Sequence, residues 1–319
     1  MSDADRLHEL LGLPAVEFQR ETEGSARPRA DAVAWRICVD PYDSDDGEVT
    51  WEEEFEAFLE AVDPSGVEAL IIGQWAESYE ETSAYPIGLV VAAADRLTSL
   101  RAIFVGDLVV EEAEISWIEQ SDVTALLTAF PDLTHLGVRG GTDLIFPPVK
   151  HDSLRGLVIE SGGLPAEALR GVLDSELPSL EHLDLWLGVS SYGGDVVVPD
   201  LAPLLAGTRF PRLRHLGLRN SELQNEIAAV IGSAPVVAQL RSLDLSNGTL
   251  GDEGAAALLE GQPLTHLTSL DLHHHFLTEP MERRVSEALE PHGVSVDLSG
   301  RCEPWDNRGP EGRYTAVAE

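Results

Sequence analysis

The chain has little positive charge. It contains 21 Lys and Arg residues against 56 Asp and Glu residues, a net charge of -35, and Lys150 is its only lysine. A surface this acidic repels the phosphate backbone of nucleic acids and the headgroups of anionic lipids, so no nucleic acid and no membrane is expected as a partner. The same field attracts basic partners, although acidity also simply keeps a protein in solution.

The chain also lacks cysteine clusters and long apolar runs. Its two cysteines, Cys38 and Cys302, suggest neither a disulfide framework nor a zinc cluster. The first residues do not form a secretory signal, and no stretch approaches the length of about 20 apolar residues that a membrane span needs. A cytoplasmic location is therefore expected. Phosphate-loop, dinucleotide-binding and nucleophile-elbow motifs are absent as well, so the sequence favours neither an enzyme nor a cofactor.

A leucine pattern recurs along most of the chain. In "LRSLDLSNGTLGDEGAAALLEGQPLTHLTSLDL", Leu240, Leu243 and Leu245 follow the pattern L-x-x-L-x-L, which returns 27 residues later from Leu267. Earlier triplets begin at Leu213, Leu180, Leu154 and Leu133, weaker ones begin at Leu100, Val67 and Ala34, and a last trace contains Val296. So many triplets in register identify a repeat protein.

Each triplet precedes a helix-like run. "DEGAAALLEG" and "NEIAAVIGSA" are examples, in which Asp252 and Asn225 are placed to cap a helix. The strand buries alternate side chains and the helix buries one face against it, so the units must stack side by side. The expected fold is an α/β right-handed solenoid, or horseshoe, of nine or ten repeats, with a parallel sheet on the concave face and helices on the convex face.

The repeat resembles a known family. "LDLSNGTLGDEGAAALL" is similar to the α/β leucine-rich repeat of the ribonuclease-inhibitor type, and the resemblance covers roughly residues 60–300. Steps of up to 33 residues exceed the roughly 20–29 expected of such repeats, which implies insertions. The ladder asparagine of that family is replaced, for example by Gly248, Ser221 and His275, so other groups must bond the turn backbone.

A narrower resemblance concerns particular segments. "VEALIIGQW", "LWLGVSSYGGD" and "LDLHHHFLTEP" are similar to an uncharacterised bacterial leucine-rich-repeat family, whose genes tend to lie beside radical-SAM and ATP-grasp-like genes. This resemblance implies partnership with a modifying or biosynthetic enzyme. It implies no activity for the chain itself.

The pattern divides the chain into three parts. Residues 1–62 form an N-terminal lead-in and cap, in which Thr50 and Glu53 predict a capping box at a helix start. Residues 63–300 form the solenoid, and residues 301–319 form a C-terminal tail whose lack of periodicity is compatible with flexibility. Insertions at 73–86, 106–123 and 187–200 exceed what a tight connection needs.

The concave face and the insertions carry the candidate partner-binding residues. Side chains on either side of the buried leucines point to the concave face, and its C-terminal half carries carboxylates beside histidines. Aromatic side chains in the insertions suit an interface, although each can equally pack its loop onto the solenoid. The residues predicted to bind a partner are Trp75, Phe104, Trp117, Arg139, Asp184, Trp186, Tyr192, Arg219, Asp244, Asp271 and His273. They predict a non-catalytic module or scaffold that binds a protein or peptide, and the acidic field favours a basic one.

A metal site is the alternative interpretation. Asp244, Asp271 and Asp297 should lie on consecutive strands, about one strand spacing apart. Carboxylates this close repel one another unless one is protonated or a cation lies between them, and His273 would complete a ligand set. That set predicts a metal-dependent enzyme or a metal-binding protein. Aspartate is nevertheless common at this exposed strand position, and the sequence shows no groups that would orient such ligands.

The run His273-His274-His275 is a weak metal signal by itself. Consecutive residues of an extended chain cannot all point at one ion. His273 should face the concave side, whereas His275 occupies the former asparagine position, where hydrogen bonding to the turn backbone is the expected role.

Overall fold

The structure is a computed structural model that describes residues 5–20, 26–40, 49–76, 81–305 and 309–318. Part of the expected insertion at 73–86 therefore lies outside the described residues. No helix in the described ranges is both long and apolar enough to cross a membrane.

Twelve strands of the described chain form one open sheet in which every strand pairs with the next one along the sequence. Only β1 and β2 are antiparallel, and all the other pairs are parallel. The strands are β1 Glu9–Leu10, β2 Leu13–Glu17, β3 Ala34–Ile37, β4 Ala69–Ile72, β5 Ala102–Val105, β6 His135–Arg139, β7 Gly156–Glu160, β8 His182–Gly188, β9 His215–Ser221, β10 Ser242–Asp244, β11 Ser269–Asp271 and β12 Ser295–Asp297.

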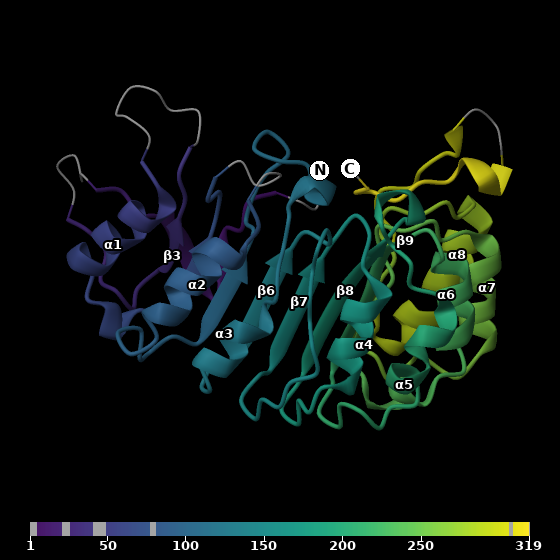
Figure 1. Cartoon of the computed structure of the whole chain (residues 1–319). Helices are drawn as coiled ribbons and strands as arrows, with labels where there is room; N and C mark the ends of the chain where they lie inside the picture. Colours follow the sequence, from purple (N-terminus) through teal and green to yellow (C-terminus); the bar gives the residue numbers. More distant parts are fainter. Residues whose placement is uncertain (1–4, 21–25, 41–48, 77–80, 306–308, 319) are drawn as a thin grey trace.

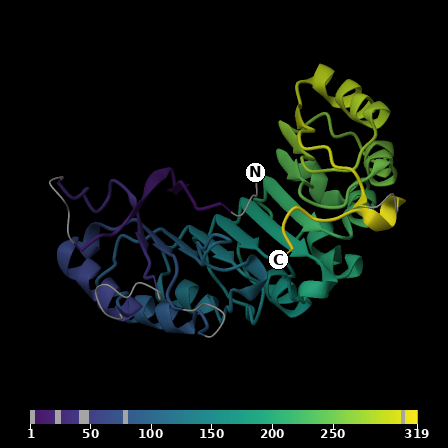
Figure 2. The ribbon, with the colours of Figure 1, turned by 90° about the horizontal axis from the view of Figure 1, so that it is seen from above.

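Helices lie along one face of this sheet (Figure 1). They are α1 Trp51–Ala61, α2 Ala84–Ala92, α3 Thr124–Ala129, α4 Ala166–Asp174, α5 Ala202–Leu205, α6 Gln224–Ile231, α7 Asp252–Glu260 and α8 Glu279–Leu289. Figure 2 shows the row of strands following an arc with the helices on its outer side. The main hydrophobic core lies between the helices and the strands, and the repeated leucines supply much of it. We call the opposite side of the sheet the open face.

Register follows the leucine repeat. Leu216, Leu243 and Leu270 are paired on neighbouring strands, and the residues on either side of them face the open face. Small residues there make room for larger neighbours: a Cβ atom at Gly137 would lie 2.2 Å from the ring of Phe104, and one at Gly217 would lie 2.7 Å from the carboxylate of Asp184.

The N-terminal residues cover part of the open face. Leu7, Leu10 and Leu13 pack on a second apolar cluster that includes Ile71 and Phe104. The sheet itself also extends into residues 1–62, because β2 pairs with β3 and β3 pairs with β4. The predicted capping box at the start of α1 is present, with Thr50 and Glu53 bonded reciprocally.

The C-terminal tail is packed along the carboxyl ends of the strands. It runs back from the last repeats toward the middle of the sheet, and both chain ends lie at this edge (Figure 1). The Ala316 amide donates to the Asn247 carbonyl at 2.9 Å, and the Ser116 hydroxyl donates to the Ala318 carbonyl at 2.5 Å. The second contact joins residues 202 positions apart in sequence.

Candidate functional site

A buried charge cluster lies at the carboxyl ends of the strands from β3 to β7. Asp107, directly beyond β5, has no exposed surface and accepts a hydrogen bond from Arg36 Nε at 2.8 Å. Arg139, which is 1% exposed, lies 3.7 Å from the same carboxylate and donates to Glu160 Oε2 at 2.7 Å. Burial raises the pKa of Glu160, and the charge of Arg139 opposes that rise.

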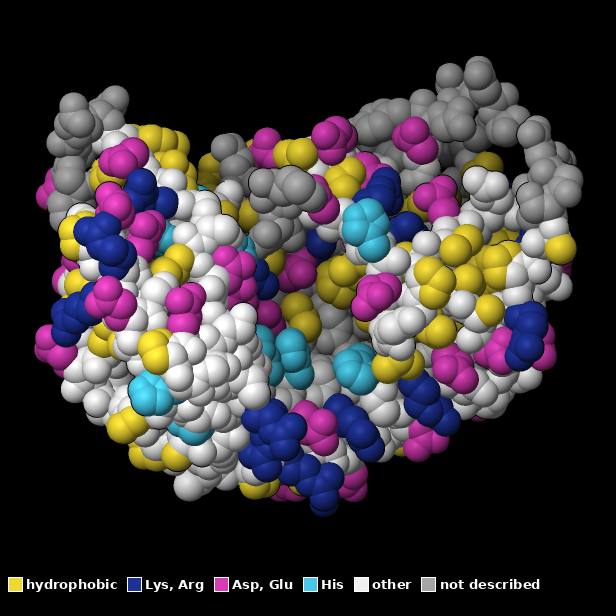
Figure 3. All heavy atoms as spheres, turned by 180° about the vertical axis from the view of Figure 1, so that it is seen from behind, with side chains coloured by type: hydrophobic (Ala, Val, Ile, Leu, Met, Phe, Trp, Pro, Cys, Tyr) yellow, Lys and Arg dark blue, Asp and Glu magenta, His cyan; other side chains and the backbone are white. Residues whose placement is uncertain are grey.

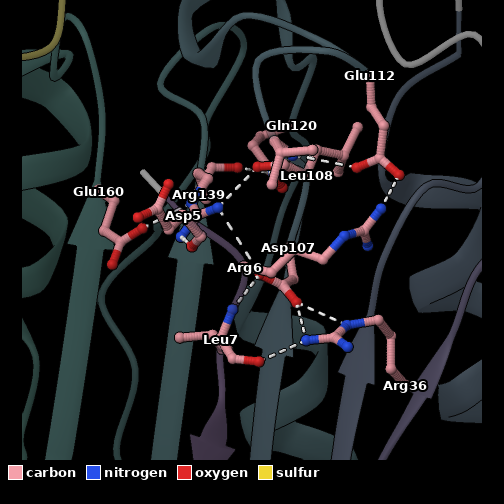
Figure 4. Close-up of polar contacts among 11 residues, drawn as sticks. Asp5, Arg6, Leu7, Arg36, Asp107, Leu108, Glu112, Gln120, Arg139 and Glu160 are labelled. Carbon is pink, nitrogen blue, oxygen red and sulfur yellow. Dashed lines mark hydrogen bonds and ion pairs between the residues drawn. The ribbon is translucent and has the colours of Figure 1, made fainter. Parts of the chain in front are cut away.

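These charged side chains bind the main chain of the N-terminal segment (Figure 4). Asp107 Oδ1 accepts from the Leu7 amide at 3.0 Å, and Arg36 donates to the Leu7 carbonyl at 2.6 Å. Arg139 donates to the Asp5 carbonyl at 3.0 Å and to the Leu108 carbonyl at 2.7 Å. Because each contact involves a main-chain group, the cluster fixes an extended segment whatever its side chains are. Arg139 is therefore engaged inside the protein.

A second cluster lies over β8 to β10 on the open face. Arg219 is shared by two carboxylates, with Nη1 3.4 Å from Asp184 and Nε 3.2 Å from Asp244. Its guanidinium lies 5.1 Å from the ring centre of Trp186. Burial raises the pKa of Asp244, and Arg219 opposes the rise. Burial acts in the same way on Asp184, but contact with His215 and the charge of Arg219 outweigh it and leave the pKa of Asp184 lowered.

Histidines line the amino side of the same strands. The rings of His182 and His215 are stacked, with centres 4.0 Å apart and planes 6° apart, and His215 Nδ1 lies 2.8 Å from the Ser242 hydroxyl. Burial, with a smaller contribution from His215, lowers the pKa of His182 to about 4. His182 is consequently neutral near pH 7.

Acid is expected to destabilise the protein through His182. Its folded pKa lies below the ordinary value of 6.5, so the unfolded chain takes up the proton first and the free energy of unfolding falls between pH 6.5 and about 4. The full shift corresponds to about 3 kcal/mol. Urea unfolding at pH 7.5 and 4.5 should show a smaller loss for His182→Asn than for the parent chain. Equal losses in both proteins would contradict this assignment.

The predicted acidic row is present, and three of the four predicted metal-ligand residues lie together. Asp244, Asp271 and Asp297 are paired in register on β10, β11 and β12. Ligand atoms of Asp271, His273 and Asp297 lie within 4.8 Å of one another, and Asp244 is not in that group. Asp271 Oδ1 already accepts from the His273 amide at 2.9 Å and lies 2.8 Å from its Nδ1 atom.

His182, Asp184 and His215 form a second group of metal-ligand type within the same distance. An imidazole binds a metal in its own ring plane, and two parallel stacked rings cannot both point at one ion without rotating. Arg219 also already supplies a cation to Asp184. Neither group supports a metal centre better than it supports packing and ion pairing.

The other histidines of the triple run serve the turn. His275 is fully buried, and its Nε2 atom lies 2.9 Å from the Leu298 carbonyl while Nδ1 accepts from the Leu277 amide at 3.1 Å. This is the expected turn-bonding role. His274 lies with its Nε2 atom 3.1 Å from the Tyr314 carbonyl, in the C-terminal tail.

A pocket of about 750 Å³ opens at the carboxyl edge of the sheet. Most of its walls come from three distant segments: residues 108–115, the turn that contains Tyr192, and the tail residues Trp305 and 313–318, and Arg139, Glu222 and Thr249 complete the lining. Trp305 stacks on Tyr314 with ring centres 4.7 Å apart. Val110 and Trp305 in the walls are 62% and 65% exposed, and Trp117, next to the tail contact at Ser116, is 55% exposed. Val110 and Trp305 are thus exposed apolar side chains of the pocket, whereas Trp117 is not among the residues that line it.

The structure separates the predicted aromatic residues into two groups. Trp75 and Trp186 are each 1% exposed, and Phe104 is covered by the N-terminal segment, so these three side chains pack the fold. This is the packing role that the sequence left open. Trp117 is exposed and Tyr192 lines the pocket.

Sequence reasoning missed the contribution of the tail. Val317 bonds through its amide to Asn220 Oδ1 at 3.1 Å and packs on Trp186. Nothing in the repeat pattern predicts these contacts, because the tail carries no periodicity. The aromatic residues Trp305 and Tyr314 in a short polar segment were the available signal.

Comparison with known proteins gives a structural relative. A crystal structure of a protein from Bacteroides fragilis is similar to this chain, with a TM-score of 0.80 and 28% sequence identity. The match covers 89% of this chain and 77% of the other. No protein-family model and no curated protein sequence matches the chain.

Proposed function

We propose that the chain is a horseshoe-shaped leucine-rich-repeat module that binds a protein or peptide without chemistry of its own. The ordered stacking of strands and the leucines in register support the repeat assignment. A modifying or biosynthetic enzyme is the partner class that the sequence resemblance implies. The cytoplasmic location expected from the sequence is part of the same proposal.

The pocket at the carboxyl edge is the observation that carries this proposal. Its volume suits one or two apolar side chains of a partner, and the exposed side chains of Val110 and Trp305 offer apolar contact area in its walls. Tryptophan is enriched among the few residues that contribute most of the binding energy of a protein interface. The open edge of a rigid sheet also lowers the ordering cost of binding.

The row of Asp244, Asp271 and Asp297 favours a positively charged partner. Asp271 and Asp297 lie on the part of the open face beyond the N-terminal cover, and Asp297 is exposed. Together with the net charge of -35, they favour a partner segment that combines an apolar anchor with basic residues.

A peptide array tests the proposal. Decapeptides that combine one aromatic or aliphatic anchor with zero to four arginines should bind, and affinity should rise with the number of arginines. Trp305→Ala should weaken the best peptide by about tenfold or more, as measured by fluorescence anisotropy. Ile145→Ala is the matched control, because that side chain is 55% exposed and does not line the pocket.

Two results would argue against the proposal. One is the absence of saturable binding across the array. The other is a peptide that binds Trp305→Ala and the Ile145→Ala control with equal affinity.

A further inference from the structure

A row of arginines marks the amino ends of the central strands. Arg155, Arg214 and Arg241 each directly precede a strand, and all three are exposed. Main-chain hydrogen bonds place them in register: the Glu181 amide donates to the Arg155 carbonyl, the Arg214 amide to the Glu181 carbonyl, and the Arg241 amide to the Arg214 carbonyl. We call Arg155, Arg214 and Arg241 the arginine rim.

The arginine rim is unusual in so acidic a chain. Arg101, further along the same edge, lies 3.8 Å from the Asp132 carboxylate. Within the described residues, no ion pair within 4.0 Å is found for Arg155, Arg214 or Arg241, although acidic residues outnumber basic ones by 56 to 21. Arg214 reaches only main-chain carbonyls, such as that of Gln239 at 3.0 Å.

Repulsion between these neighbouring arginines destabilises the folded chain unless a negative charge lies between them. Arg214 and Arg241 start adjacent strands, about 4.8 Å apart, and like charges at such neighbouring positions destabilise a sheet. Glu181 lies between Arg155 and Arg214 in the row, so three positive charges face one negative charge. An anion lying between the guanidinium groups would remove the repulsion.

The rim borders a hollow on the open face. Figure 3 shows Lys and Arg side chains gathered below the hollow, directly beside a group of histidines. His182 directly follows Glu181, and His215 directly follows Arg214. The rings of these two histidines stack on each other. The positions paired with them on the outer strands are Gly156, over which the ring of His135 lies, and Ser242.

We propose that the arginine rim binds an oxyanion, either a phosphate or a carboxylate group of a ligand or partner. Guanidinium groups present paired N–H donors that match two oxygens of such a group, which an ammonium group cannot do. The rim lies at the amino ends of the strands, whereas the pocket lies at their carboxyl ends, so this inference does not depend on the proposed function.

Titration with inorganic phosphate provides the first test. Phosphate is added at pH 7.5 with sodium chloride adjusted to hold the ionic strength constant, and NMR follows the arginine Nε–H groups and the backbone amides of residues 155, 182, 214 and 241. We expect saturable shifts confined to these signals. The double variant Arg155→Gln/Arg214→Gln should bind at least about tenfold more weakly. Arg283→Gln, an exposed arginine on α8 paired with Glu279, is the matched control and should bind as the parent does.

Peptides distinguish the two sources of the anion. Three peptides of one sequence carry phosphoserine, glutamate or serine at the central position. Binding of the first alone assigns a phosphate group, binding of the second alone assigns a carboxylate, and binding of both assigns an oxyanion of either kind. The inference is overturned if phosphate shifts are linear, if chloride alone reproduces them, or if none of the charged peptides binds better than the serine peptide. Thermal midpoints no lower than that of the parent chain would confirm that the arginine variants remain folded.

Discussion

Replacing Asp107 with alanine is expected to lower the free energy of unfolding by about 3–5 kcal/mol. The carboxylate is fully buried and pairs with Arg36 at 2.8 Å. Without it, that guanidinium stays buried with no carboxylate partner, and the Leu7 amide loses its acceptor. Arg139 keeps Glu160 and loses less. Removing one partner of a buried ion pair costs far more than removing the whole pair.

Urea unfolding measures this change, and hydrogen exchange locates it. Amides of residues 7–17 and of β3 should exchange faster in Asp107→Ala, because the N-terminal segment is released from the open face. Asp132→Ala is the control: its side chain is 73% exposed and lies 3.8 Å from Arg101, so a loss of at most about 1 kcal/mol is expected. If both variants lose equal stability, the buried cluster does not hold the segment.

Replacing Asn220 with alanine is expected to release the C-terminal tail and to cost about 3 kcal/mol. The side chain is fully buried and bonds both main-chain groups of Val317, and it also donates to the Ser161 carbonyl at 3.2 Å. Its backbone has φ of 51°, in the left-handed region that asparagine tolerates better than alanine. Lost hydrogen bonds and backbone strain therefore act together.

A glycine variant separates the two contributions. Asn220→Gly removes the hydrogen bonds without strain at positive φ, so it should be more stable than Asn220→Ala by about 1 kcal/mol. In both variants trypsin should cut after Arg313 faster than in the parent chain, because the tail is no longer held at Val317. Slow cleavage in both would show that the ion pair between Arg313 and Glu253, at 2.8 Å, is sufficient to hold the tail.

The repeated part of the fold could be predicted because its signal is periodic. One leucine triplet defines which residues face the core and which face outward, and the next triplet fixes the register. The pairing of Asp244 with Asp271, and of Asp271 with Asp297, was therefore correctly predicted. The turn-bonding role of His275 followed in the same way from its position in the repeat.

The contacts that join distant segments could not be predicted in this way. Asp107 bonds the main chain of Leu7, and Asn220 bonds that of Val317, and any residue at the second position would offer the same groups. Such contacts leave no pattern in the sequence.

Two predicted helix-capping residues bond the main chain of a different repeat from the one expected. Asn225 and Asp252 were expected to cap helices of their own repeats. In the structure Asn225 accepts from the Gly251 amide at 2.8 Å and Asp252 accepts from the Thr278 amide at 2.8 Å, so each bonds the following repeat. Stacking provides a partner that a single repeat cannot show.

The packed tail has a consequence for synthesis on the ribosome. Each strand pairs with the strand made just before it, so the sheet can grow while translation proceeds. The wall formed by residues 313–318 is made after all twelve strands, and it returns to Ser116 and Asn220, which were made long before. The pocket therefore cannot form before residues 313–318 have been made. A partner that binds this pocket would distinguish chains that contain residues 313–318 from folded truncation products that lack them.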